Sequence, residues 1–238
     1  MTGTSEPSAL EGFSGRHLLG IQGLSPLEID YLLNLYGEGN LNLATPLSNL
    51  ASANETKGDY KASVQQHLTA IEILLAHPQG NEYALALSYN NLGVCFAAMN
   101  DYAQSLQYHE KALAIKQQAF PKDYANLALS YNNIGSCYQS MFNPERAAPI
   151  YKRAVVMQEQ VAQGGEKALG LYLNNQGTVL LELGRTEAAI AVHERALNVQ
   201  QAALPERHPD LGLSYLNYGV ALQKKERNSE AGRHFQQA

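Results

Sequence analysis

Five asparagines recur through this sequence of 238 residues at a constant interval of 42 residues. An asparagine amide both donates and accepts hydrogen bonds, so it can bond the N–H and C=O groups of an extended peptide whatever that peptide's side chains are. The five are Asn49, Asn91, Asn133, Asn175 and Asn217. The chemistry to expect from such a ladder of amides is recognition of a peptide backbone.

The same ladder also has a structural interpretation, in which the amides bond neighbouring helices, and the sequence leaves both roles open. Three further asparagines directly precede ladder members and would widen the ladder: Asn90, Asn132 and Asn174. As polar residues expected at a helix surface, these three favour the structural role. A hydrogen bond contributes only about 0.5–1.5 kcal/mol net, and ordering a peptide opposes binding. The ladder alone therefore predicts weak binding, and we expect side-chain pockets to add affinity.

Three histidines raise the alternative of metal binding or acid–base catalysis. They share one phase of the 42-residue interval with two other aromatic residues, in the order His67, His109, Tyr151, His193 and Phe235. A shared aromatic phase is typical of a packing position. No two histidines have the spacing of a zinc-binding helix, and the sequence has no Gly-rich phosphate loop or nucleophile elbow. We expect no catalytic residues, no metal and no cofactor.

The elements that must carry the asparagines are helices in pairs. Tyr83 to Met99 has apolar residues spaced by three and four, which predicts a first helix, helix A, that carries Asn91. Asp101 is a suitable N-cap for a second helix, helix B, over Tyr102 to Phe120. Small residues recur where helix B must approach helix A closely: Ser63, Ser105, Ala147, Ala189 and Ala231.

Proline and glycine predict where the B helices end. Proline cannot continue a helix, and glycine readily adopts the left-handed cap conformation. The residues expected to end successive B helices are Pro121, the pair Gly164-Gly165, and Pro205.

Composition excludes several classes of function. The net charge of −5 is spread over the chain, and no block of Lys and Arg suits a nucleic-acid surface. No apolar run of about 18 residues predicts a membrane span, and Met1 to Gly15 lacks the features of a signal peptide. We expect no nucleic-acid or membrane partner and a cytoplasmic location. Cys95 and Cys137 occupy the same phase of adjacent units, which predicts two free, buried thiols.

The repeated unit resembles the tetratricopeptide repeat, in which a large residue, Leu-Gly and an aromatic on helix A are followed by small-aromatic-Ala on helix B. The matching residues in the second unit are Tyr89, Leu92, Gly93, Phe96, Ser105, His109 and Ala112. The 42-residue period and the stretch from Arg207 to Gly219 are similar to the subclass found in kinesin light chains. The third unit departs from the pattern, because Phe142-Asn-Pro144 stands at the turn where other units have Gly or Asn.

The resemblance implies an all-α, right-handed superhelix, an α-solenoid of five units over residues 43–238 with the last one truncated. It implies that the A helices line a concave groove and that the five ladder asparagines point into it. A clamp for a C-terminal carboxylate, which some related arrays form with Lys and Arg, is disfavoured because those positions hold Leu129, Ser136, Leu171 and Thr178. Exposed charges on helix B at Lys111 and its equivalents are expected to form a charged outer face.

The N-terminal segment gives separate predictions. Residues 1–15 are rich in Ser, Gly, Thr and Glu, which predicts disorder. Residues 16–42 are expected to form a capping segment, with a helix from Pro26 to Tyr36 started by the capping box of Ser25 and Glu28. Residues 16–35 also resemble the first helix of aspartate carbamoyltransferases, but the Ser-Thr-Arg-Thr phosphate loop of that family does not occur here.

The sequence therefore predicts a non-enzymatic scaffold that binds an extended peptide segment of a partner protein in the groove. Two alternatives remain: a regulatory or sensor module of a larger signalling protein, and a remnant of a carbamoyltransferase-like enzyme at the N-terminus. Because Ala238 falls inside the fifth helix B, further repeats or domains are expected to follow it.

Overall fold

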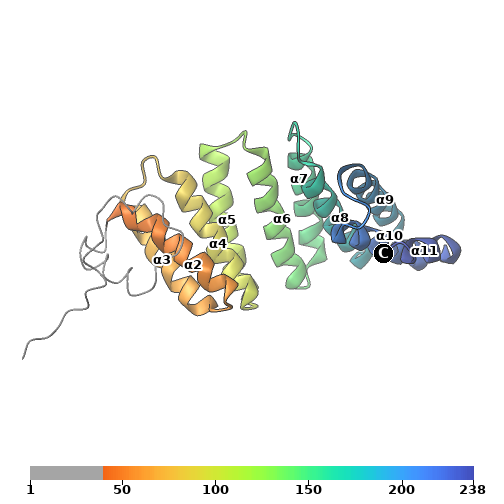
Figure 1. The fold of residues 1–238 in the computed structure, drawn as a ribbon, viewed down its shortest axis with the longest axis horizontal. Coiled ribbons are helices and arrows are strands. Elements are labelled where there is room, and N and C mark those ends of the chain that lie inside the picture. Colours follow the sequence, from red (N-terminus) through yellow and green to blue (C-terminus); the bar gives the residue numbers. More distant parts are fainter. Residues whose placement is uncertain (1–39) are drawn as a thin grey trace, which may run out of the picture. The chain divides into compact units, whose positions relative to one another are not determined.

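The structure is a computed structural model that describes residues 40–238, and within this range the chain is helical and contains no β-strand. One short 3₁₀ helix and ten α-helices occupy the described range (Figure 1): η1 (Leu41–Leu43), α2 (Ala44–Thr56), α3 (Tyr60–Ala76), α4 (Glu82–Ala98), α5 (Tyr102–Ala119), α6 (Tyr124–Ser140), α7 (Pro144–Gln158), α8 (Glu166–Glu182), α9 (Thr186–Ala203), α10 (Pro209–Lys224) and α11 (Asn228–Phe235). The all-α prediction is confirmed. The predictions for residues 1–15 and for the helix from Pro26 to Tyr36 lie outside the described residues.

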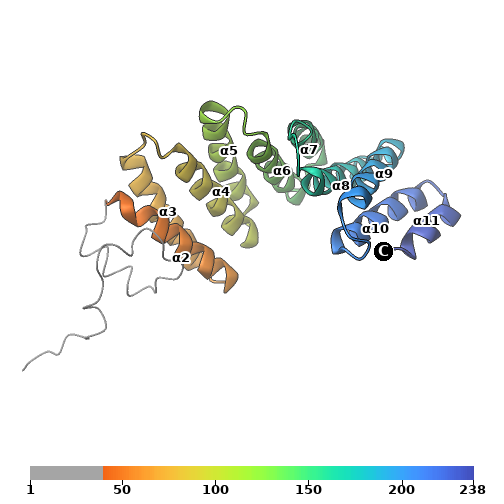
Figure 2. The same cartoon turned by 45° about the horizontal axis from the view of Figure 1, so that its top comes forward.

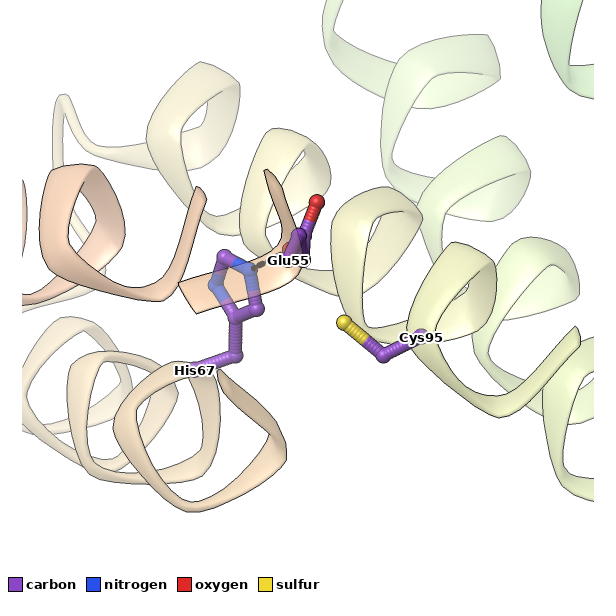
Figure 3. A group of neighbouring side chains, drawn as sticks. All are labelled: Glu55, His67 and Cys95. Atoms are coloured by element: carbon purple, nitrogen blue, oxygen red, sulfur yellow. Dashed lines mark hydrogen bonds and ion pairs between the residues drawn. The ribbon is translucent and has the colours of Figure 1, made fainter. Parts of the chain in front are cut away.

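The chain divides into two compact units between Ala84 and Leu85. In the first unit, α2 and α3 pack against each other as the predicted helix pair. The His67 ring on α3 points toward Glu55 on α2 (Figure 3), and its Nε2 lies 2.9 Å from Glu55 Oε1. Ser63 Oγ donates a hydrogen bond of 3.0 Å to the same carboxylate oxygen. Polar contacts thus accompany apolar packing in this pair.

The second unit repeats the same helix pair along the chain. Each of the helices α5 to α10 contacts the next one in sequence, and Figures 1 and 2 show these helices following one another in chain order. The rings of Phe96 on α4 and Tyr108 on α5 stack at 5.4 Å between centroids. The A helices of this unit are α4, α6, α8 and α10, and the B helices are α5, α7, α9 and α11.

A glycine on each A helix of the second unit makes room for the aromatic residue of its B helix. A Cβ atom on Gly135 would lie 2.8 Å from the Tyr151 ring, and one on Gly177 would lie 2.6 Å from the His193 ring. Such distances are too short for carbon contacts, so only glycine permits this approach. The predicted packing role is confirmed by burial for His67, His109, Tyr151 and His193. The five small residues predicted at the close approach are all buried as well.

The helix boundaries agree with the sequence to within a residue where the caps are strong. Helix α4 covers Glu82–Ala98 and α5 covers Tyr102–Ala119, and the Asp101 carboxylate accepts a hydrogen bond of 3.1 Å from Gln104 N, as predicted. Helices α5 and α9 end just before Pro121 and Pro205. Helix α7 instead ends at Gln158, ahead of the glycine pair, and the Gln158 side chain donates to the Gly165 carbonyl at 3.1 Å.

The turn between helix A and helix B places one residue per unit in the left-handed region. The five positions again follow the 42-residue interval: Gly58, Asn100, Phe142, Gly184 and Glu226. Glycine and asparagine adopt this conformation readily, whereas a bulky aromatic residue does so at a cost. Phe142 has φ of 56° and is 94% exposed, so its side chain gains almost no packing in return.

Candidate functional site

Three positions on each A helix of the second unit form one continuous face, which we call the A-helix face. They are spaced by four and then three residues, so they lie on the same side of a helix. The first row holds Leu87, Leu129, Leu171 and Leu213; the second holds Asn91, Asn133, Asn175 and Asn217; the third holds Val94, Ser136, Thr178 and Val220. Four of the five predicted ladder asparagines therefore recur on this face, and Asn49 lies exposed on α2 in the first unit.

The leucine row of this face is exposed. Leu87, Leu129, Leu171 and Leu213 are 46%, 37%, 43% and 47% accessible to solvent. Single exposed leucines are ordinary, but a row in phase over four helices forms a repeated apolar surface. In the sequence, Leu129 and Leu171 are informative at first only as positions that lack cations. The four leucines are spaced by 42 residues, and this spacing is the sequence signal from which the row could have been predicted.

Side-chain amides bond the A helices to one another. Asn133 Nδ2 donates to Asn90 Oδ1 at 3.1 Å, and Asn175 Nδ2 donates to Asn132 Oδ1 at 2.8 Å. Each ladder asparagine thus reaches the first asparagine of the preceding unit. Asn90 and Asn132 are buried rather than at the helix surface as predicted, because the side of the A helix that carries them faces the next A helix.

Asn133 and Asn175 keep part of their hydrogen-bonding capacity. Within residues 40–238, no group donates to the Oδ1 atom of either residue, and each uses only one amide N–H on its neighbour. Both side chains are half-buried. A structural role for one N–H therefore leaves the carbonyl oxygen of the same side chain without a hydrogen bond among the described residues.

Asn174 behaves differently from Asn90 and Asn132. Its Oδ1 lies 3.2 Å from His193 Nδ1, and its Nδ2 donates to Ser214 Oγ at 2.5 Å. Ser214 Oγ in turn donates to Gln200 Oε1. All four residues are buried, so they form a closed polar network across α8, α9 and α10. Asn174 is committed to this network and is buried away from any ligand.

On the A-helix face of the second unit, Asn91 and Asn217 are the ladder members whose side chains make no hydrogen bond to another A helix among the described residues. Asn91 Oδ1 accepts only a long hydrogen bond of 3.4 Å from Asn90 on the same helix. In the part of the chain that the structure describes, the Asn217 side chain makes no hydrogen bond, because Asn174 is taken up by the buried network. Substitution of Asn91 and Asn217 would therefore remove ladder amides while leaving one hydrogen-bond donor on Asn133 and on Asn175 in place between the A helices.

The A-helix face carries no charge. Residues 83–98 of α4, all of α6, residues 168–181 of α8 and residues 211–223 of α10 include no Asp, Glu, Lys or Arg. The predicted absence of a carboxylate clamp is consistent with this surface. Charged residues gather on the B helices, where Lys111, Arg153 and Arg195 are exposed as predicted, and Arg195 pairs with Glu159.

Burial between the helices shifts the pKa values of two histidines. Burial lowers the pKa of His109 to about 4, with a further contribution from the nearby Lys116 ammonium. Burial alone lowers the pKa of His193 to about 4. Both imidazoles are therefore neutral at pH 7 and serve as packing groups. Cys95 and Cys137 are buried and form no disulfide with each other, as predicted.

Lys116 is a buried cation that the sequence analysis missed. Its Nζ donates to Ser130 Oγ at 2.9 Å, and burial lowers the pKa of its ammonium group. The same phase of the 42-residue interval holds Gln158 and Gln200, which are also buried. Comparison of these phases was the signal that would have identified Lys116 as an inter-helix residue.

Comparisons with known proteins agree with this geometry. A sequence profile described as "Tetratricopeptide repeat" matches residues 84–160 and 169–238. No curated protein matches the sequence. Neither comparison supports the similarity of residues 16–35 to aspartate carbamoyltransferases. No helix in the described range is both long and apolar enough to cross a membrane.

Solved structures share the fold at low sequence identity. BtubC (BKLC) from P. vanneervenii is 19% identical with a TM-score of 0.74, over 88% of this chain and 84% of that chain. A putative kinesin light chain from Podospora anserina with nearly identical TPR-like repeats is 15% identical with a TM-score of 0.71, over 83% and 94%. NprR in complex with its cognate peptide NprX is 14% identical with a TM-score of 0.58, over 87% and 58%.

Proposed function

Because the chain belongs to the tetratricopeptide repeat family, we propose that it is a non-enzymatic scaffold whose A-helix face binds an extended peptide segment of a partner protein. The single observation that carries this proposal is the repeated, uncharged row of exposed leucines beside partly unbonded amides. An exposed apolar surface of this regularity is typical of a binding surface. The amides supply the polar groups that an extended backbone needs.

The chemistry of the face favours backbone recognition over catalysis. It holds Leu, Asn, Val, Ser and Thr, and none of these is activated as a nucleophile or general base by a neighbouring residue of the face. The half-bonded amides of Asn133 and Asn175 are held in place by their inter-helix hydrogen bonds, so little entropy is lost when they bond a ligand. Preorganised amides and apolar contacts together suit a peptide partner.

The proposal extends to the organisation of the chain. We take residues 43–238 as five units of 42 residues, with the last one truncated, and residues 16–42 as a capping segment. A cytoplasmic location and the absence of nucleic-acid and membrane partners belong to the same proposal. NprR, a structure with a similar fold, holds a peptide. A Signal Transduction ATPase with a tetratricopeptide repeat sensor also shares the fold, which favours a regulatory or sensor module as the second candidate function.

Selection from a phage-displayed library of random peptides tests the proposal, with purified full-length chain as bait. The informative variant is Asn91→Ala/Asn217→Ala, because these two side chains hold no other helix. Each lost amide contact is worth about 0.5–1.5 kcal/mol, so selected peptides should bind about tenfold more weakly or worse. The thermal melt should stay unchanged.

The matched control is Lys111→Ala/Arg195→Ala, which alters the exposed B-helix surface instead. It should leave peptide affinity unchanged. Selected peptides that bind the Asn91→Ala/Asn217→Ala variant as tightly as the wild type, while losing affinity for the control, would place the binding surface on the B helices and refute the proposal.

A further inference from the structure

We propose that the ligand of the A-helix face is an uncharged peptide in the polyproline II conformation, with an aliphatic side chain at every third residue. This inference rests on the proposed function and adds the chemical class of the ligand. Three features carry it: the exposed leucine row on helices joined by side-chain amides, the absence of charge, and the Oδ1 atoms of Asn133 and Asn175, which accept no hydrogen bond within residues 40–238.

The spacing of the leucine row selects a period of three residues. Adjacent A helices are direct neighbours, because side-chain amides join α4 to α6 and α6 to α8. Packed helices lie roughly 8–10 Å apart, so neighbouring leucines of the row are separated by about that distance. A polyproline II helix advances about 3.1 Å per residue and turns once every three residues. Every third side chain therefore returns to the same side after about 9.3 Å, in register with the row.

A β-strand ligand does not match this spacing. Its side chains return to one face every two residues, which is about 6.6 Å, and every four residues, which is about 13 Å. Neither distance agrees with the separation of the A helices. A helical ligand is also disfavoured, because its backbone groups are bonded internally and cannot use the amides of the ladder. Polyproline II has no internal hydrogen bonds, so its N–H and C=O groups remain available.

The absence of charge on the face sets the chemistry of the ligand's side chains. A Lys, Arg, Asp or Glu pressed against Leu129 or Leu171 would lose hydration without gaining an ionic partner. Burial of an unpaired charge costs several kcal/mol. Aliphatic side chains meet no such cost and gain from contact with the leucine row. The ligand is thus expected to be neutral where it crosses α4, α6, α8 and α10.

The test measures binding of capped, fluorescein-labelled synthetic peptides to the full chain by fluorescence polarisation. The probe consists of four Leu-Pro-Ser triplets. One comparison peptide replaces every Leu by Glu, and another keeps the composition but alternates Leu with Ser ahead of a run of Pro. We expect the triplet probe to bind at least about tenfold more tightly than either comparison peptide, which corresponds to about 1.4 kcal/mol.

Substitutions locate the binding. Leu129→Ser/Leu171→Ser should weaken the triplet probe about tenfold or more without changing the melt, because both side chains are partly exposed. The matched control is Val156→Ser, which removes an exposed apolar residue from α7 and should leave affinity unchanged.

The outcomes for the inference and for the proposed function can be told apart. Equal or tighter binding of the Glu peptide or the alternating peptide would overturn the inference. If that binding is still lost in the Asn91→Ala/Asn217→Ala variant, the proposed function stands. Failure of all three peptides to bind also overturns the inference, and the phage selection then decides the proposed function independently. Triplet binding that survives Leu129→Ser/Leu171→Ser would overturn the inference as well.

Discussion

The contacts between α4, α6 and α8 differ from those between α8 and α10, although equivalent positions of the repeat supply them. In the first region, Asn90 and Asn132 each accept a hydrogen bond from the ladder asparagine of the next unit. In the second region, Asn174 bonds His193 and Ser214 instead, and Asn217 is left without a hydrogen bond among the described residues. The role of an asparagine in the repeat is therefore decided by its buried neighbours rather than by its phase alone.

The residue over the A-helix glycine contributes to this difference but does not decide it, because His109 lies over Gly93 with Nδ1 unbonded among the described residues while Asn90 still accepts from Asn133. At His193, Nδ1 is within hydrogen-bonding distance of Asn174. The equivalent Tyr151 donates its hydroxyl to Gln139 at 2.9 Å, so Asn132 stays available for Asn175. Asn174 leaves the ladder where His193 is accompanied by Ser214 and Gln200, which complete the buried network.

Acidification is expected to produce the largest loss of folding stability. His109 and His193 are neutral in the folded state with pKa values near 4, whereas in the unfolded chain each binds a proton below about pH 6.5. The unfolded state therefore holds more protons, and the stability present above pH 6.5 is lost as the pH falls toward 4, by about 3 kcal/mol per histidine. Urea midpoints measured across this range should fall steeply.

A His109→Phe variant assigns this pH dependence to individual histidines. Phenylalanine is suitable because it occupies the equivalent position 235. This variant should lose about half of the histidine-linked pH dependence and stay stable at pH 7, because His109 Nδ1 has no hydrogen-bond partner among the described residues. His193→Phe should flatten the profile equally but lower stability at pH 7, because Asn174 loses a partner. Identical behaviour of the two variants at pH 7 would break the comparison.

Substitution of the equivalent residues Asn132 and Asn174 is expected to give the next largest loss of unfolding free energy. Asn174→Ala leaves His193 and Ser214 buried with missing partners, which should cost about 2–3 kcal/mol of unfolding free energy. Asn132→Ala should cost about 1 kcal/mol, because the half-buried Asn175 can bond water instead. Chemical denaturation at pH 7 followed by circular dichroism measures both. A larger loss for Asn132→Ala than for Asn174→Ala would contradict the account.

Lys116 on α5 and Gln200 on α9 occupy equivalent positions, and a substitution there is expected to change the unfolding free energy less. Both are buried, and each contacts a serine in the second turn of the next A helix, Ser130 and Ser214 respectively. Lys116→Gln removes a buried ammonium group while keeping a donor for Ser130, so the unfolding free energy at pH 7 should rise by about 1 kcal/mol. The matched control is the exposed Lys152→Gln on α7, which should change the midpoint little. Destabilisation by Lys116→Gln would show that the amine is required there.

A substitution in the turn between helix A and helix B should have the smallest effect on the unfolding free energy. Phe142 occupies the left-handed position that Gly184 holds one unit later. Phe142→Asn, which copies Asn100, should raise the unfolding free energy by about 0.5–1 kcal/mol, because asparagine tolerates this conformation and the phenylalanine side chain is exposed. A shift in melting temperature reports the gain. A lower melting temperature would mean that the Phe142 ring has a packing role not evident from its exposure.

The sequence predicted the helix pairs well because each rests on local signals. The Asp101 cap, the prolines at 121 and 205, and the paired Gly and aromatic phases all act within one unit. The end of α7 was less predictable, because Gln158 turns back to the Gly165 carbonyl, a contact that no local pattern encodes.

The candidate site was predictable only in part. The phase of the ladder asparagines was visible, and it correctly identified residues of the A helices. The burial of Asn90, Asn132 and Asn174 was not, because it depends on how one A helix faces the next. The switch of Asn174 to His193 and Ser214 depends on residues 19 and 40 positions away in sequence, which only the folded packing brings together.

Photo-crosslinking from a bound peptide would test the central claim most directly. A phage-selected peptide that carries a benzophenone group at successive positions would be irradiated with the full chain, and the attached residues identified by mass spectrometry. The account predicts crosslinks to α4, α6, α8 and α10, close to Leu129, Asn133 and their equivalents in the other units, that move along the array as the label moves. Crosslinks confined to the exposed faces of α5, α7 and α9 would contradict it.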